Sequence, residues 1–276
     1  MFFDAMQALR PDAEIQHYDL TMLGNPALRQ AIADIYATCD HVISCGVGPE
    51  MGPLADDALR ATVPRLDIVP SFSFAGFHPD TVYVPTPCGM LDGITHHYHS
   101  RVALGAYLAG RGVAETAGLY NALVFGRLGY FDAFAAERAM AIRLYGYFGI
   151  EIGPLIDGWL ARGCFMHSIN HPKHWAFAEL ALAICRQVGL VGADAMAPTG
   201  AVIDNLRHHA AHPVLPPLAV RLGVPGSTLY KLSDAREPGE VPLEAFLAAE
   251  FEAFATAERA TLQAVPGVAA WQAMLG

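Results

Sequence analysis

Short apolar segments alternate with helix-forming segments through residues 1–85, and this alternation constrains the fold more than any other feature of the sequence. The helical segments carry apolar residues at helical spacing, and one begins with the ordinary signal of Asn25 followed by Pro26. Strands that alternate with helices are typical of βαβ units and a parallel sheet. The expected elements here are helices at 1–9, 26–36 and 54–61, and strands at 14–20, 41–45, 66–74 and 81–84.

From Ser100 onward the sequence favours helices almost throughout. The expected helices lie at 101–109, 113–125, 131–147, 154–161, 173–188, 213–223 and 243–264. We therefore predict an α/β protein with a Rossmann-like parallel sheet in its N-terminal third and a large, mostly helical C-terminal part. Because no clear linker interrupts the chain, a single domain is expected over 1–276, with a sheet portion (1–97) packed against a helical portion (98–276).

The composition limits the kinds of molecule that this protein is expected to bind and the location in which it is expected to act. Charged residues make up only 16% of the chain and hydrophobic residues 53%, which excludes disorder and indicates a large buried surface. Lys and Arg number 17 against 27 Asp and Glu, for a formal net charge of −10, so a nucleic-acid partner is not expected. No apolar run reaches the roughly 18 residues of a transmembrane helix, and no signal peptide is recognised. Five scattered cysteines are typical of reduced thiols, so a cytoplasmic location is expected, and an oligomer is left open.

The densest group of candidate catalytic residues lies in 165–172 (FMHSINHP). Pro172 disfavours a helical conformation at His171 and suits the first turn of a following helix, so Asn170 and His171 are expected at a helix N-terminus. The helix dipole disfavours a charged imidazole there, so His171 should be neutral and able to accept a proton. The same end attracts a phosphate or a developing oxyanion. The alternative is that Asn170 only caps the helix and His171 packs in a loop.

A second motif, Gly76-Phe77-His78-Pro79-Asp80, follows an expected strand. Open α/β sheets bind ligands at the carboxyl ends of their strands. Asp80 could orient an imidazole, as carboxylates do in catalytic triads, or the motif could simply be a Pro-Asp turn. We expect the imidazoles of His78 and His171 to face a common cleft.

A third group of histidines precedes Ser100. His96, His97 and His99 could bind a metal, but no acidic or cysteine ligand is near in sequence, so no metal site is predicted. Ser100 is expected to cap the next helix, where His99 and Arg101 would contact an anion. Lys173, directly after the Asn-His-Pro motif, completes this expected anion-binding set.

Two cysteines are candidate nucleophiles. Cys45 follows an expected buried strand, and Cys164 lies three positions before His167, so a histidine could activate either thiol. The alternative for both is an inert, packed thiol.

Several of these segments resemble the WcbI-type polysaccharide biosynthesis enzymes. The likeness covers about residues 1–231 and is carried, in the same order, by 71–84 (SFSFAGFHPDTVYV), 98–110, 150–165 and 165–172. The family includes a coenzyme A-binding protein of bacterial capsule synthesis. The resemblance therefore implies coenzyme A or acetyl-CoA as co-substrate and an acyl acceptor on a glycan.

The sequence departs from the family pattern at its beginning. Family members usually start with a strand that ends in a Gly-Asn-Cys-Gln turn, before a helix that resembles Met1 to Leu9. That strand and turn are absent from this sequence, so the family's candidate cysteine nucleophile has no counterpart here. Either Met1 is a wrongly chosen start, or the step that needs the turn has been lost.

The leading hypothesis is a CoA-dependent acyltransferase that transfers an acetyl group to a saccharide hydroxyl. His171 would be the base, and Asn170 with the helix N-terminus would bind the oxyanion. The supporting residues would be His167, His78 and Asp80, and the CoA-binding residues would be Arg101, Ser100, His99 and Lys173. The alternatives are a glycan esterase on the same site and a non-catalytic homologue that binds CoA or glycan.

Overall fold

The structure is a computed structural model that describes residues 1–18, 24–234 and 239–275. The chain forms two compact units, each assembled from three segments. Unit 1 comprises Met1–Phe72, Ala141–Leu155 and His174–Ile203, and unit 2 comprises Ser73–Met140, Ile156–Lys173 and Asp204–Gly276. Each unit therefore draws on both expected portions, 1–97 and 98–276, and the single domain stays a prediction.

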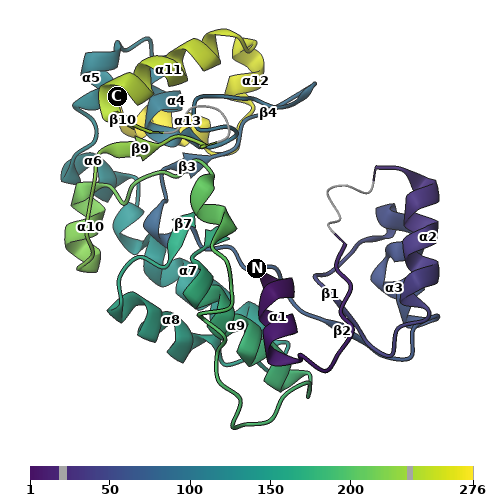
Figure 1. The fold of residues 1–276 in the computed structure, drawn as a ribbon. Coiled ribbons are helices and arrows are strands. Elements are labelled where there is room, and N and C mark those ends of the chain that lie inside the picture. Colours follow the sequence, from purple (N-terminus) through teal and green to yellow (C-terminus); the bar gives the residue numbers. More distant parts are fainter. Residues whose placement is uncertain (19–23, 235–238, 276) are drawn as a thin grey trace. The chain divides into compact units, whose positions relative to one another are not determined.

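Unit 1 contains the parallel pairing that the alternating N-terminal pattern predicts. β1 (Val42–Ser44) pairs in parallel with β2 (Leu66–Ile68), and Val42 lies opposite Leu66. α2 (Pro26–Tyr36) precedes β1, and α3 (Asp56–Arg60) lies in the connection between the strands (Figure 1). The α/β class is confirmed, but the parallel sheet in the described part of the chain has only these two strands.

Local signals set the ends of the helices in unit 1. Asn25 accepts a hydrogen bond from the backbone N–H of Ala27 at 2.9 Å, which caps α2 as expected. α1 (Phe2–Leu9) ends shortly before Pro11 and packs against α9 (His174–Gln187) through small buried side chains. The strand expected at 14–20 does not form over residues 14–18, and its last two residues lie outside the described residues.

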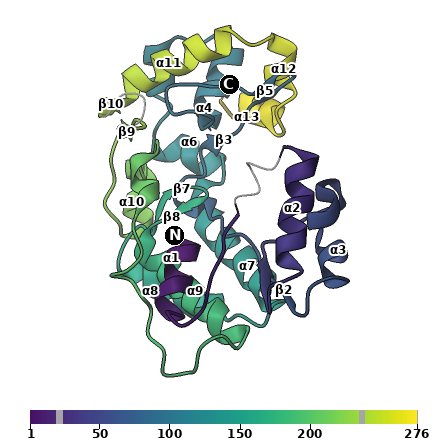
Figure 2. The ribbon, with the colours of Figure 1, turned by 45° about the vertical axis from the view of Figure 1, so that its right-hand side comes forward.

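Unit 2 is mainly helical, with short antiparallel strand pairs. Its helices are α4 (Arg101–Leu108), α5 (Val113–Ala117), α6 (Ala122–Arg127), α10 (Pro216–Leu222), α11 (Leu243–Ala255), α12 (Arg259–Gln263) and α13 (Val268–Leu275). The mostly buried α4 packs against α11, α12 and α13 (Figure 2). α7 (Ala133–Gly146) and α8 (Ile152–Ala161) contribute to both units.

The strand pairs of unit 2 position most of the candidate residues. They are β3 (Thr81–Val82) with β6 (His99–Ser100), β4 (Pro85–Thr86) with β5 (Gly89–Met90), β7 (Met166–Ser168) with β8 (His171–Pro172), and β9 (Leu229–Lys231) with β10 (Glu240–Pro242). All four pairs are antiparallel. In the described residues, no helix is both long and apolar enough to cross a bilayer.

Two of the expected helices are interrupted in the structure. The helix expected at 113–125 is divided into α5 and α6, because Asn121 starts a new helix by accepting a hydrogen bond from Val124 N at 3.1 Å. The helix expected at 243–264 is likewise divided into α11 and α12. The final helix, α13, was not predicted.

A cluster of buried aromatic rings fixes the His78-Pro79 and His171-Pro172 motifs of unit 2 to each other. The ring of Phe165 lies 5.0 Å from Phe74 and 4.9 Å from Phe77 between centroids, and Phe134 lies 5.0 Å from Phe74. The backbone also joins the motifs, since Phe74 N donates to Ile169 O at 2.7 Å. His78 and the β7–β8 hairpin are therefore held by one core.

Gly76 allows the closest approach within this cluster. A Cβ at this position would lie 2.8 Å from the Cα of Phe134 and 2.5 Å from the ring of Phe74. Backbone cannot give way as a flexible side chain can, so we expect Gly76→Ala to lower the free energy of unfolding by about 1–3 kcal/mol. Denaturant unfolding checks this, with Gly158→Ala as the matched control, since a Cβ there meets nothing within 4 Å. Equal stability of the two variants would contradict the prediction.

Candidate functional site

The FMHSINHP segment folds as a hairpin, not as the start of a helix. Ser168 in β7 lies opposite His171 in β8, and Ile169 and Asn170 form the turn. α9 begins only at His174, so the prediction that Asn170 and His171 lie at a helix N-terminus is wrong. The extended conformation expected at His171 is confirmed, because Pro172 is accommodated in a two-residue strand.

Hydroxyl groups hold the side-chain amide of Asn170. The hydroxyl of Tyr98 donates to Asn170 Oδ1 at 2.6 Å, and Ser168 Oγ lies 3.1 Å from the same oxygen. On the other side of the amide, Nδ2 donates to the hydroxyl of Tyr83 at 3.3 Å. Because the oxygen faces these hydroxyls and one N–H donates to Tyr83, the second N–H of the exposed Asn170 amide is the group left to meet a ligand.

His171 is a weakly partnered imidazole beside this amide. Its Nδ1 is buried without a hydrogen bond among the described residues, and its Nε2 lies 3.4 Å from the hydroxyl of Tyr98, which is long for a hydrogen bond. Burial lowers the pKa of His171 to about 4, and the nearby His209 and His167 add to this effect. The ring is therefore neutral near pH 7, as expected, but burial and not a helix dipole is the cause.

A second histidine of the hairpin pairs with a carboxylate. His167 Nε2 lies 3.0 and 3.1 Å from the two carboxylate oxygens of Asp204, and these side chains are 19% and 13% exposed. Asp204 precedes the short 3-10 helix Asn205–His208 without capping it. The carboxylate thus holds the His167 ring and stabilises a positive charge on it.

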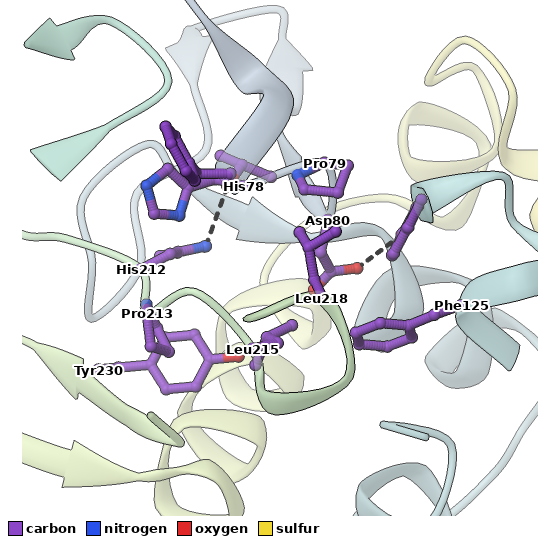
Figure 3. Close-up of a pocket in the computed structure, with 12 residues that line it drawn as sticks. His78, Pro79, Asp80, Phe125, His212, Pro213, Leu215, Leu218 and Tyr230 are labelled. Atoms are coloured by element: carbon purple, nitrogen blue, oxygen red, sulfur yellow. Dashed lines mark hydrogen bonds between the residues drawn. The ribbon is translucent and has the colours of Figure 1, made fainter. Parts of the chain in front are cut away.

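His78 lines a narrow pocket in unit 2 that has room for about one water molecule (Figure 3). Asp80 and His212 line the same pocket, and His171 does not. Burial lowers the pKa of His78 to about 4, and the backbone of Pro213 and Met166 opposes the shift. Both ring nitrogens are buried without a well-formed hydrogen bond among the described residues. Tyr98 lies between His171 and this pocket, with its ring centroid 6.0 Å from that of His171 and 6.1 Å from that of His212.

Asp80 stabilises local structure, and its expected pairing with an imidazole is not observed among the described residues. Its Oδ1 accepts hydrogen bonds from the hydroxyl of Tyr130 at 2.8 Å and from Val102 N at 3.0 Å. Burial raises the pKa of Asp80 to about 6, although Ser100, Val102 and Tyr130 oppose the shift through hydrogen bonds. The carboxylate therefore joins the start of α4 to Tyr130.

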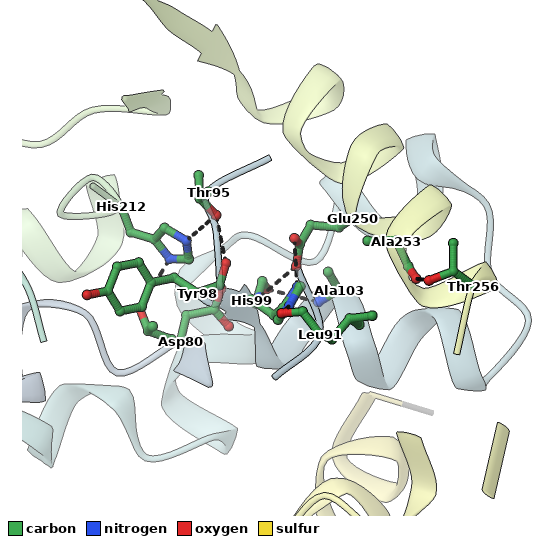
Figure 4. A network of polar contacts seen from close by, with 12 residues as sticks. Asp80, Leu91, Thr95, Tyr98, His99, Ala103, His212, Glu250, Ala253 and Thr256 are labelled. Atoms are coloured by element: carbon green, nitrogen blue, oxygen red, sulfur yellow. Dashed lines mark hydrogen bonds and ion pairs between the residues drawn. The ribbon is translucent and has the colours of Figure 1, made fainter. Parts of the chain in front are cut away.

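His212 is held as one defined tautomer. Thr95 Oγ1 donates its proton to Tyr98 O at 2.7 Å, so the His212 Nε2 that lies 3.2 Å from Thr95 Oγ1 must be the donor in that contact (Figure 4). His212 Nδ1 then accepts from Thr81 Oγ1 at 3.1 Å. Burial lowers the pKa of His212 to about 3, which agrees with a neutral ring.

Most of the expected anion-binding set is engaged inside unit 2. Ser100 caps α4 by accepting from Ala103 N at 3.0 Å, which confirms the predicted cap. His99 and Ser100 are both 0% exposed, so they offer no surface to an anion in this structure. The guanidinium of Arg101 lies 5.4 Å from the ring centroid of Trp271, and its Nε is buried. Lys173 is the half-buried cation that follows the hairpin.

The candidate nucleophiles and ligands outside this cluster are weaker. Cys164 Sγ donates to Met166 O at 3.2 Å, and burial raises the pKa of Cys164, so its unreactive thiol form is favoured. Cys45 is exposed in unit 1. Among the described residues no three His, Cys, Asp or Glu side chains are grouped to hold a metal ion.

Sequence reasoning missed five residues of this site: Tyr83, Tyr98, Asp204, His212 and Glu250, whose carboxylate lies 3.0 Å from His99 Nδ1. His212 did have a signal, because the chain contains three His-Pro dipeptides, His78-Pro79, His171-Pro172 and His212-Pro213, and all lie in unit 2. The contacts of the two acidic residues come from distant segments that carry no recognisable local pattern.

The mixed α/β fold is shared with a known class of enzymes. A family model for the polysaccharide biosynthesis enzyme WcbI matches residues 6–193. The chain therefore belongs to the WcbI family of polysaccharide biosynthesis enzymes, as the sequence motifs indicated.

A solved structure supports the shared fold. The structure of WcbI, described as a novel polysaccharide biosynthesis enzyme, matches with a TM-score of 0.75 at 15% identity, over 98% of this chain and 92% of that one. It is the native form of that protein, without a disulfide bond between coenzyme A and one of its cysteines. No curated protein matches the chain.

Proposed function

We propose that this protein is a CoA-dependent O-acyltransferase that moves an acetyl group from acetyl-CoA to a saccharide hydroxyl. Membership of a polysaccharide biosynthesis family and the association of coenzyme A with the related structure support the substrate class. The observation that carries the chemistry is the neutral imidazole of His171 beside the fixed amide of Asn170.

The residues at the hairpin fit the reacting end of a CoA thioester. His171 has a buried nitrogen without a partner, and Asn170 turns its N–H groups away from the hydroxyls that hold its oxygen. For the phosphate end, Lys173 is the cation beside the hairpin, whereas Arg101, Ser100 and His99 would first have to leave their internal contacts. The fit is therefore best for the thioester and weaker for the phosphates.

In this proposal each residue has one task. Acetyl-CoA supplies an activated acetyl group. The unpartnered Nδ1 of His171 accepts the proton of the acceptor hydroxyl as that oxygen attacks the thioester carbonyl, and Asn170 Nδ2 donates to the oxyanion that forms. Tyr98 and Ser168 keep the amide turned for that donation.

Replacement of His171 tests the function. His171→Ala is expected to lower kcat for acetyl transfer by about 100- to 1000-fold, because the proton acceptor is lost. The affinity for CoA, measured by titration calorimetry, should change by less than about threefold, since this ring makes no phosphate contact in the proposal.

The exposed His97 supplies the control, and His97→Ala should leave both quantities unchanged. No heat with CoA at millimolar concentration would overturn the proposal. Ester hydrolysis without CoA would instead assign water as the acceptor and make the protein an esterase.

A further inference from the structure

Two histidines of one hairpin have opposite electrostatic surroundings. His171 is packed against the rings of Tyr98 and His209, where burial favours its neutral form. His167 faces both carboxylate oxygens of Asp204, and a carboxylate favours a protonated ring. Where neighbouring titratable groups are driven apart in this way, one is suited to be the base and the other the acid of a reaction.

The register of the β7–β8 hairpin affects the direction of the His167 side chain. Met166 pairs with Pro172 and Ser168 pairs with His171, so His167 is an extra residue at an irregularity in β7. Such bulges break the alternation of side chains between faces and re-aim one of them, often beside active sites. The charge of His167 also contributes to the lowered pKa of both His171 and His78.

One short segment contacts both histidines of the hairpin. Asp204 contacts His167, and His209, five positions later, has its ring centroid 5.0 Å from that of His171. Asp204 lies beyond the residues 6–193 that the family model covers, so the family match says nothing about it. The pair is mostly buried, so solvent ions screen its interaction little.

We propose that Asp204 is a positioning residue that holds His167 as an imidazolium, and that His167 is the general acid that protonates the departing CoA thiolate. This assignment rests on the proposed acyltransferase function. Two histidines then share the proton transfers. His171 is the base that takes the proton of the acceptor hydroxyl, and His167 is the acid that gives a proton to the thiolate.

The proposed step balances in atoms and electrons. The acceptor hydroxyl gives its proton to His171 Nδ1 while its oxygen bonds to the acetyl carbon. The tetrahedral intermediate then breaks its C–S bond, and the electron pair goes to sulfur. His167 gives the proton on Nδ1 to that sulfur, which releases CoA as a free thiol. Transfer of one proton from His171 to His167 restores the starting state.

Asp204→Asn tests the assignment because the amide has the same shape without the charge. In a bell-shaped pH profile of kcat, the alkaline limb reports the acid. We expect this limb to move to lower pH in the variant, with a loss of about 10- to 100-fold near pH 8 and less than about threefold near pH 6. The acidic limb, which belongs to His171, should not move, and a merely structural role would lower kcat equally at both values.

A second readout does not depend on turnover. NMR titration of the labelled His167 ring, whose charge interacts with His78 and His171, should show a lower midpoint in Asp204→Asn. The matched control is Asp234→Asn, since Asp234 lies 2.7 Å from His208 in an exposed pair of the same unit. That variant should leave the profile and the His167 titration unchanged.

The outcomes separate the two proposals. No acetyl transfer by the wild-type protein would overturn the proposed function, and this assignment with it. Normal transfer with equal losses at both pH values in Asp204→Asn, or an unmoved His167 titration, would overturn only the roles of Asp204 and His167.

Discussion

Lowering the pH from 7 to about 4 is expected to reduce the free energy of unfolding, and the titration of His78, His171, His212 and Asp80 contributes a net loss of roughly 7 kcal/mol. Burial lowers the pKa of His78 and His171 to about 4 and that of His212 to about 3. In the unfolded chain these rings protonate near pH 6.5, so the unfolded state binds more protons between the two values. The stabilisation is present above pH 6.5 and is lost as the pH falls toward 4.

Asp80 acts in the opposite direction over part of the same range. Burial raises the pKa of Asp80 to about 6 from an unfolded value of 3.8, so the folded state binds its proton first as the pH falls. This carboxyl group therefore gains roughly 3 kcal/mol of stabilisation between pH 6 and about 4. The three histidines together lose roughly 10 kcal/mol, of which the half-buried His171 contributes least, so the net effect is destabilising.

His78→Leu isolates one histidine of this effect. Its ring nitrogens make no well-formed hydrogen bond among the described residues, so leucine removes the titration and keeps an apolar side chain in the core. Urea unfolding at pH 7 and pH 5 should show a pH-dependent difference that is smaller by about 2 kcal/mol in the variant than in the wild type. The exposed His97→Ala is the control, and parallel pH curves for wild type and His78→Leu would contradict the prediction.

The parts of the fold that follow from local chemistry could be predicted from the sequence. The Asn25-Pro26 helix start and the Ser100 cap depend on residues adjacent to each helix, and both are observed. The Asn-His-Pro motif also has the pattern of a helix start, but tertiary contacts determine its structure instead. Phe165 packs in the aromatic cluster and Phe74 N donates to Ile169 O, so the segment folds back as a hairpin.

The candidate site shows the same division. His171 and Asn170 were found because they lie together in a distinctive short motif. Asp204 and Glu250 contact histidines 37 and 151 positions away in the chain, and no single-sequence pattern specifies such pairs. Three His-Pro dipeptides in one chain were the available signal for His212, since a proline fixes the backbone beside each imidazole.

The pair between His99 and Glu250 is the most completely buried charge interaction described in unit 2, with both side chains 0% exposed (Figure 4). His99 Nδ1 lies 3.0 Å from Glu250 Oε1, and its Nε2 lies 3.1 Å from Leu91 O. Burial alone would lower the pKa of His99, but the hydrogen bond and charge of Glu250 outweigh it and raise the pKa. Two acceptors on one ring therefore favour the imidazolium.

Glu250 also holds the backbone at the start of α4. Its Oε2 accepts a hydrogen bond from Ser100 N at 3.0 Å, so one side chain of α11 joins β6 to the helix that packs beneath it. A Cβ on Gly93 would lie 3.0 Å from the His99 ring and 3.3 Å from Glu250 Oε1, so the backbone of Gly93 packs closely against the pair. Removal of the carboxylate should therefore leave His99 and Ser100 N buried without this partner, which lowers the free energy of unfolding.

Glu250→Leu is expected to lower the free energy of unfolding at pH 7 by about 3–5 kcal/mol, because His99 and Ser100 N lose their partner in a buried place. Glu250→Gln should cost less, about 1–3 kcal/mol, since its amide oxygen can still accept from Ser100 N. Chemical denaturation followed by tryptophan fluorescence measures both, and the exposed Glu252→Gln on the same helix should stay within about 0.5 kcal/mol of the wild type. If Glu250→Leu were as stable as Glu250→Gln, leucine packing would compensate for the lost charge pair, and His99 would not need its carboxylate to remain buried.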